Sequence, residues 1–185
     1  MMRLFPLELL LACKKGDASA QRKLFDFYYD EMYQVCYRYV KDEMLVEDLL
    51  SQGFTKVLNK IGKFRAEKEN GLRAWIKTIM INECLMQLRR RNNFYLVPLS
   101  DADELSTEEV DFDEIDQSFV RQCIAELPTG YRTVLNLYVI EGYAHAEIGK
   151  MLDIKEATSR SQLNKAKQIL KQRLLSYKLS LYGKG

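Results

Sequence analysis

The chain divides by charge into three parts. Residues 93–118 hold nine acidic residues and no lysine or arginine, which gives them a net charge of −9. By contrast, residues 1–92 carry a net charge of +5 and residues 119–185 carry +6. A run of like charges cannot be buried in a core, and its own repulsion keeps it extended. We therefore expect two small basic domains, at 1–92 and 119–185, joined by an acidic linker at 93–118.

Helices are the expected secondary structure on both sides of this linker. Glycine and proline together number only 12 of 185 residues, while hydrophobic residues make up 47%. So few turn-forming residues favour helices over a turn-rich β architecture. The spacing of apolar residues predicts N-terminal helices over about 17–41, 42–60 and 72–92, after a short helix within 4–12. The fold class is therefore expected to be all-α.

The sequence offers no membrane-spanning segment. No apolar run approaches the roughly 20 residues that a bilayer span needs. The leucine-rich start is short and is interrupted by Pro6 and Glu8, so it does not fit a secretory signal either. We expect a cytoplasmic protein without membrane insertion.

Cysteine and histidine offer little catalytic or metal-binding chemistry. The four cysteines are Cys13, Cys36, Cys84 and Cys123. No two lie close enough for a zinc or redox motif, so each is expected to be a small buried hydrophobe. The single histidine, His145, has no evident catalytic partner and is expected at the surface or beside a helix cap. We expect no metal, no cofactor and no enzymatic activity.

Residues 142–163 are the most informative segment. They predict a short helix over about 144–152, a tight turn at 153–155, and a second helix that follows directly. Gly149 stands where two crossing helices need a small residue. Asp153 stands where the turn often needs a left-handed residue, a conformation that Asp tolerates better than most. The pattern is typical of a helix-turn-helix.

The outward face of the second helix is expected to bind double-stranded DNA. Its polar side chains are of the kinds that hydrogen-bond base edges and phosphates in a major groove. These residues are Arg160, Ser161, Gln162, Asn164, Lys165 and Lys167. An ordinary solvated helix face is the alternative, but the small residue, the turn, the corner residue Ile154 and the polar face coincide in register. The acidic linker is then either a plain spacer or a phosphate mimic that covers a basic face in the absence of DNA.

A loop at 62–71 and the helix after it combine cations with aromatic residues. Such a combination can hold single-stranded DNA, because aromatic rings stack on bases and cations follow the backbone. The residues concerned are Lys63, Phe64, Arg65, Trp75, Lys77 and Asn82. From periodicity alone, however, Trp75 fits a core position.

Two segments of the chain resemble domains of the extracytoplasmic-function group of bacterial sigma factors. The first resembles domain 2 and contains Val46-Glu47-Asp48-Leu49-Leu50, Phe54, Lys63-Phe64-Arg65, Leu72 to Ile79, Asn82 and Leu88 to Arg91. The second resembles domain 4 and contains Leu127-Pro128, Tyr138 to Gly142, Glu147-Ile148, Leu152, Ile154, Thr158, Ser161, Leu163 and Ala166. The resemblance covers residues 20–92 and 120–175.

The resemblance implies a promoter-recognition subunit that directs core RNA polymerase and is not itself an enzyme. Domain 4 would read the −35 element with Thr158, Arg160, Ser161, Gln162, Asn164 and Lys165. Domain 2 would read and open the −10 element with Lys63, Phe64, Arg65, Trp75, Lys77 and Asn82. The polymerase β′ coiled coil would bind Glu47, Asp48, Gln52 and Lys56. The β flap and an anti-sigma factor are further implied partners.

The docking segment departs from the family pattern at one point. The family commonly has Gln-Glu shortly before the Phe, where this chain has Ser51-Gln52-Gly53. A glycine in the middle of a helix costs about 1 kcal/mol relative to alanine.

Two other functions remain open at this stage. A stand-alone helix-turn-helix regulator, which binds operators as a dimer, would explain residues 120–175 but not the N-terminal half. A helical adaptor that binds protein would explain the aromatic residues but not the positioned polar face.

Overall fold

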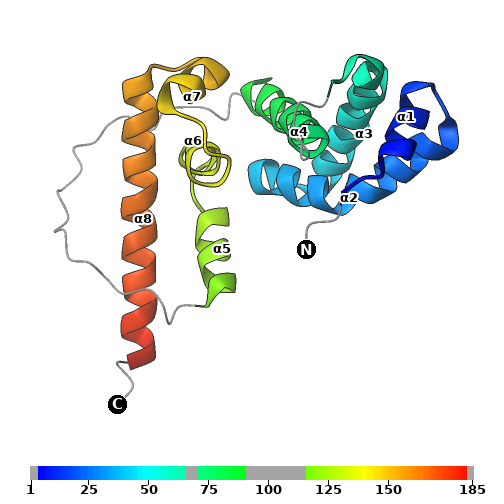
Figure 1. The fold of residues 1–185 in the computed structure, drawn as a ribbon. Coiled ribbons are helices and arrows are strands. Elements are labelled where there is room, and N and C mark those ends of the chain that lie inside the picture. The colour runs from blue at the N-terminus through cyan, green and yellow to red at the C-terminus, as the bar shows by residue number, and fades with distance from the viewer. Residues whose placement is uncertain (1–3, 66–70, 91–115, 183–185) are drawn as a thin grey trace. The chain divides into compact units, whose positions relative to one another are not determined.

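In the computed structural model, the described residues are 4–65, 71–90 and 116–182, and every regular element among them is helical (Figure 1). These residues belong to two compact units, Met1–Leu88 and Arg89–Gly185. The expected all-α fold is confirmed. Most of the expected linker, residues 93–115, lies outside the described residues.

The described residues of the N-terminal unit form four α-helices and one short turn of 3-10 helix. They are α1 (Leu7–Lys14), α2 (Ala18–Val40), α3 (Glu43–Lys60), η1 (Ile61–Lys63) and α4 (Gly71–Arg90). The three main helices begin within one residue of their expected starts, and two of these starts carry a local signal. Asp17 caps α2 by accepting a hydrogen bond from the Ala20 amide at 2.7 Å. Asp42 caps α3 in the same way through the Leu45 amide at 3.1 Å.

α3 packs closely against α4 at the glycine inside α3. A Cβ built on Gly53 would overlap the side chain of Met80, which is itself fully buried in α4. The Met80 thioether therefore fills the space that any larger residue at position 53 would need. A larger residue there would have to displace this buried but flexible side chain.

The C-terminal unit is organised around one long helix. Its elements are α5 (Gln117–Ala125), α6 (Thr129–Leu135), the π-helical turn η2 (Asn136–Ile140), α7 (His145–Leu152) and α8 (Glu156–Tyr182). α8 packs against α5, α6 and α7 in turn (Figure 1). Pro128 is the N-cap of α6, at a helix start, where a proline breaks no helical hydrogen bond.

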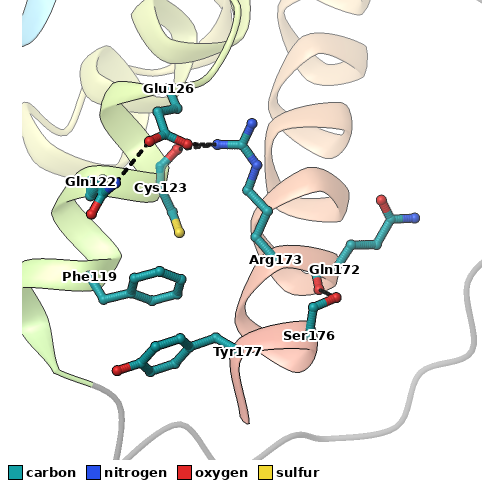
Figure 2. Close-up of a pocket in the computed structure, with 8 residues that line it drawn as sticks. All are labelled: Phe119, Gln122, Cys123, Glu126, Gln172, Arg173, Ser176 and Tyr177. Carbon is teal, nitrogen blue, oxygen red and sulfur yellow. Dashed lines mark hydrogen bonds and ion pairs between the residues drawn. The ribbon is translucent and has the colours of Figure 1, made fainter. Parts of the chain in front are cut away.

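α5 is held on the C-terminal half of α8 by apolar and charged contacts. Figure 2 shows the shallow groove between them, with the Phe119 ring stacked on the Tyr177 ring at a centroid distance of 3.9 Å. Buried Cys123 and Leu174 form the small core beneath. At the rim, the Arg173 guanidinium lies 3.0 Å from the Glu126 carboxylate.

Candidate nucleic-acid interface

α7, a tight turn and α8 form a helix-turn-helix. Asp153 ends α7 in the left-handed conformation, with φ 56° and ψ 49°, as the sequence predicted. The Ile154 amide then donates a hydrogen bond of 3.0 Å to the Gly149 carbonyl, which closes the turn. A Cβ on Gly149 would lie 2.8 Å from the Ile154 carbonyl oxygen, so the expected need for a small residue is confirmed.

The start of α7 is fixed by groups on both sides of it. Gly142 has φ 79°, a conformation that glycine adopts without a steric cost. The Ala144 amide donates to the Glu147 carboxylate at 2.8 Å. Because alanine has no side-chain oxygen, Glu147 in the first turn supplies the only side-chain contact of this cap.

The exposed stripe of α8 consists of Arg160, Asn164 and Lys167, spaced four and three residues apart. This spacing places the three side chains on one side of the helix. Thr158, Ser161 and Lys165 are partly exposed beside it. Arg160 forms an ion pair with Glu156 one turn earlier. The face can therefore offer one guanidinium, one amide and one ammonium group to a ligand.

Gln162 is not on this face, so the expectation that it faces outward is wrong. Only 6% of the residue is exposed, and it lies on the inner side of α8 with Ser159, Leu163 and Ala166. A Cβ on Gly130 of α6 would lie 3.0 Å from the Gln162 Oε1. A step of two residues along a helix turns a side chain by about 200°, so the neighbours Arg160 and Asn164 face solvent while Gln162 faces α6.

His145 is buried, which corrects the expectation that it lies at the surface, although it does follow the N-cap of α7. Its Nδ1 lies 2.9 Å from the Ser159 Oγ on α8. Its ring stacks on the Tyr138 ring of η2 at 4.3 Å. Burial, and then the positive charge of Arg160, lower the pKa of His145. Sequence reasoning did not identify Ser159, although the inward positions 163 and 166 on the same helix indicate it.

The residues expected at single-stranded DNA are divided between surface and interior. Lys63, Arg65 and Asn82 are exposed, and Lys77 is partly exposed. Trp75 is partly buried against Phe64, with their ring centroids 4.9 Å apart. The structure therefore places four polar candidates at the surface and leaves part of the indole accessible.

Phe64 is buried, and its expected role as a base-stacking surface is corrected. Only 8% of the residue is exposed, because its ring packs against Trp75. The Lys14 Nζ donates a hydrogen bond of 2.7 Å to the Phe64 carbonyl and lies 5.8 Å from the centre of the ring. Phe64 thus joins the segment after η1 to α1, and no sequence pattern indicated its partner Lys14.

The expected polymerase-binding residues lie on α3. Glu47, Asp48 and Gln52 are exposed. The Tyr29 hydroxyl donates a hydrogen bond of 2.6 Å to the Glu47 carboxylate, and this bond raises the pKa of Tyr29 to about 12. Lys56 differs from the other three because its Nζ is bonded to both carboxylate oxygens of buried Glu83, at 2.6 and 2.7 Å.

Other functional chemistry is sparse in the described ranges. All four cysteines are free and buried, which confirms their expected role as small hydrophobes. Within residues 4–65, 71–90 and 116–182, no cluster of histidine, cysteine and acidic side chains could hold a metal ion. None of the helices described there combines the length and hydrophobicity that crossing a bilayer requires.

Comparison with known proteins gives two family matches in one order along the chain. Residues 24–94 match sigma-70 region 2, and residues 120–170 match sigma-70 region 4. The chain is 26% identical to the ECF RNA polymerase sigma factor SigW of Bacillus subtilis over 177 residues, which covers 87% of this chain and 92% of SigW. It is 25% identical to the ECF sigma factor SigM of Mycobacterium tuberculosis, with 92% of this chain and 84% of SigM covered.

One solved structure supports the fold. The sigma factor RpoE from Bartonella quintana, in a co-crystal with the anti-sigma factor NepR, superposes with a TM-score of 0.50 at 18% identity. The superposition covers 84% of this chain and 96% of RpoE.

The two family matches account for both halves of the chain, whereas a stand-alone regulator would account only for the C-terminal half. The matched relatives are also covered over most of their length. The family consists of polymerase subunits that are not themselves enzymes. The chain belongs to the extracytoplasmic-function group of RNA polymerase sigma factors, which direct RNA polymerase to promoters.

Proposed function

We propose that this sigma factor reads a promoter at two separate elements, in the cytoplasm, while it is bound to core RNA polymerase. The observation that carries the proposal is the helix-turn-helix of α7 and α8, with an exposed stripe of Arg160, Asn164 and Lys167 on its second helix. Residues early in a second helix of this kind contact base edges in the major groove. α8 is therefore assigned to the −35 element.

Each exposed side chain of α8 has a chemical role in this assignment. Arg160 can donate two hydrogen bonds to one guanine, and Asn164 can bond both edge atoms of an adenine. Lys165 and Lys167 suit phosphates, which fix position without reading sequence. Thr158 and Ser161 flank the stripe with hydroxyl groups.

The −10 element is assigned to the N-terminal unit. Lys63, Arg65 and Lys77 supply positive charge that can follow a single-stranded backbone, and the accessible part of Trp75 supplies a stacking surface. Asn82 adds hydrogen-bonding capacity on the same helix. Phe64 contributes indirectly, by supporting the Trp75 ring.

Two surfaces of this chain are assigned to core polymerase. Glu47, Asp48 and Gln52 on α3 give an exposed polar face for the β′ coiled coil. In the C-terminal unit, the consecutive apolar residues Tyr138, Val139 and Ile140 are 39%, 58% and 45% exposed. Exposed apolar residues grouped in this way suit a protein contact, and we assign them to the β flap.

An anti-sigma factor is a further proposed partner. The solved RpoE structure contains the anti-sigma factor NepR bound to a sigma factor of the same fold. Such a partner would compete with polymerase or DNA for the surfaces assigned above.

Transcription with purified core polymerase tests the proposal. The chain is mixed with core enzyme, and run-off transcription is measured on a DNA library randomised across the −35 and −10 positions. We expect co-elution with core enzyme and enrichment of one bipartite sequence. If the chain does not co-elute with core enzyme, or if no sequence is enriched, the proposal is wrong. Tight binding of the free chain to duplex DNA as a dimer would instead support the stand-alone regulator.

A further inference from the structure

The interior of the helix-turn-helix contains a polar pair. Its inner faces are otherwise mainly apolar, with Ile148, Leu152 and Leu163 buried. Among them Ser159 is fully buried and His145 is 8% exposed, and the two side chains lie 2.9 Å apart. A buried hydroxyl that loses its hydrogen-bond partner is costly, so this pair is strongly held together.

The imidazole ring joins three elements of the C-terminal unit. It belongs to the first residue of α7, stacks on Tyr138 of η2 with an angle of 17° between the rings, and bonds Ser159 of α8. The stack fixes the plane of the ring, and the hydrogen bond fixes its rotation within that plane. The bond forms in either neutral tautomer, since a hydroxyl can both donate and accept.

Ser159 lies in the first turn of α8, immediately before Arg160. The backbone position of Ser159 therefore sets the point from which the Arg160 side chain leaves the helix. Bidentate bonding to a base edge requires close control of that point, because a shift on the order of 1 Å removes an oriented contact. Glu156, also in the first turn, holds the Arg160 guanidinium, so the residue that reads the base directly follows the turn that Ser159 anchors.

We propose that His145 is a positioning residue for −35 recognition: by bonding Ser159 and stacking on Tyr138, it fixes the first turn of α8 and with it the direction of Arg160. This inference rests on the proposed assignment of α8 to the −35 element. It adds a residue that does not touch DNA and that determines how sharply Arg160 discriminates between bases.

The test separates the hydrogen bond from the ring stack. His145→Phe keeps an aromatic ring on Tyr138 but leaves the Ser159 hydroxyl without its partner. His145→Asn places an amide where Nδ1 stands, so it keeps the bond and loses the stack. The double variant His145→Phe with Ser159→Ala removes both polar groups and relieves the unpaired hydroxyl. Each variant is assembled with core polymerase and transcribes the promoter library randomised at the −35 and −10 positions.

The readout is base preference in the −35 element relative to preference in the −10 element. We expect His145→Phe to lower −35 preference by about fivefold or more, while −10 preference stays unchanged. A fivefold change corresponds to the low end of the free-energy cost of a buried hydroxyl without a partner. His145→Asn is expected to recover most of the lost −35 preference. The double variant is expected to stay low, because it removes the unpaired hydroxyl without restoring the bond between α7 and α8. Full recovery in the double variant would mean that only the unpaired hydroxyl matters, and would overturn the positioning role. Circular dichroism checks that each variant is folded.

The outcomes separate this inference from the proposed function. If the wild-type holoenzyme enriches no −35 sequence, the assignment of α8 fails. If wild type enriches one and His145→Phe keeps the same −35 preference, the positioning role of His145 is wrong. A loss of activity that is equal on all promoters, or a His145→Asn variant as impaired as His145→Phe, also overturns it, because a purely structural role predicts both.

Discussion

Lys56 on α3 and Glu83 on α4 form an ion pair across the N-terminal unit, with the Lys56 Nζ 2.6 Å from a Glu83 carboxylate oxygen. The Glu83 side chain is only 6% exposed, whereas that of Lys56 is 43% exposed. The ammonium group therefore reaches water while it neutralises a buried carboxylate. Lys56 was expected to bind polymerase, and this geometry shows that it also has a structural role.

Lys56→Met is expected to destabilise the N-terminal unit, because it leaves the Glu83 carboxylate buried without a cation. Loss of one partner of a buried pair costs about 3–5 kcal/mol, and the exposed end of this pair reduces the expected loss to about 1–3 kcal/mol. Urea unfolding followed by the fluorescence of Trp75, the only tryptophan, reports on this unit. Lys56→Met combined with Glu83→Leu should recover most of the loss.

The control for this prediction is the exposed pair Arg22 and Asp26, whose side chains are 77% and 56% exposed. Arg22→Met should change the free energy of unfolding by less than about 0.5 kcal/mol. If Lys56→Met has no larger effect than Arg22→Met, the ion pair does not support the packing of α3 on α4.

Gly149→Ala is expected to destabilise the helix-turn-helix by about 1–3 kcal/mol, the usual cost of overpacking. The added Cβ would lie 2.8 Å from the Ile154 carbonyl oxygen, and a backbone atom cannot move aside as a flexible side chain can. Thermal unfolding followed by circular dichroism measures the loss. Gly62→Ala is the matched control, because the nearest atom to its Cβ would be 4.0 Å away. Equal melting temperatures for the two variants would show that α7 and α8 do not need this close approach.

Only Arg160→Ala, and not Gln162→Leu, is expected to change −35 recognition, although the sequence placed both residues at DNA. Arg160 is exposed and Gln162 is buried, with no hydrogen-bond partner for its Oε1 among the described residues. Arg160→Ala should cost about 1–3 kcal/mol of discrimination at one −35 position. Gln162→Leu should leave −35 preference unchanged and keep or slightly raise stability. Holoenzyme binding to promoter DNA with single-base changes measures the discrimination.

The matched control is Arg121→Ala, which removes an exposed arginine of α5 in the same unit. It should leave −35 preference unchanged. If Gln162→Leu changes base preference as strongly as Arg160→Ala, then α8 binds DNA through a different face.

The sequence predicted those features that depend on local chemistry. The expected helix ranges 17–41 and 42–60 begin at the capping residues Asp17 and Asp42. Gly149 and Asp153 indicate the turn, and each of these features acts within a few residues. The sequence could not predict partners that meet only in the folded chain. The Phe64 ring is buried against Trp75, and the Phe64 carbonyl is bonded by Lys14, which lies 50 residues away. The buried Gln162 side chain lies against Gly130 of another helix. A polar residue type indicates a surface position on average, and both His145 and Glu83 depart from that average because each has a hydrogen-bonding partner on another helix.

The stability of the C-terminal unit is expected to fall in mild acid because of His145. Its pKa is lower in the folded chain than its ordinary value of 6.5. Folding therefore favours the neutral ring. Its contribution to the free energy of unfolding is complete above pH 6.5 and is lost as the pH falls below that value. Glu156, Arg160 and Lys167 of α8 act on the ring, and the two cations disfavour its protonation. Hydrogen exchange of α7 and α8 should therefore accelerate from pH 7.5 to pH 5.5 once the intrinsic exchange rate is corrected. In His145→Asn the corrected rates should not change, and an equal change in both proteins would exclude His145 as the cause.

Asp48→Lys is expected to weaken binding to core polymerase without unfolding the chain. Asp48 is exposed on α3, between the exposed residues Glu47 and Gln52, so the substitution reverses a charge on the proposed docking face and disturbs no core contact. Removal of the acid and the like-charge repulsion that replaces it should lower affinity by about tenfold or more, with most of the change in the dissociation rate. Surface-immobilised core enzyme measures both rates. Glu8→Lys, the same charge change at an exposed position of α1, is the control and should bind as wild type does. If Asp48→Lys binds core enzyme as tightly as Glu8→Lys, polymerase docks elsewhere, and the exposed acids of α3 do not form the docking face.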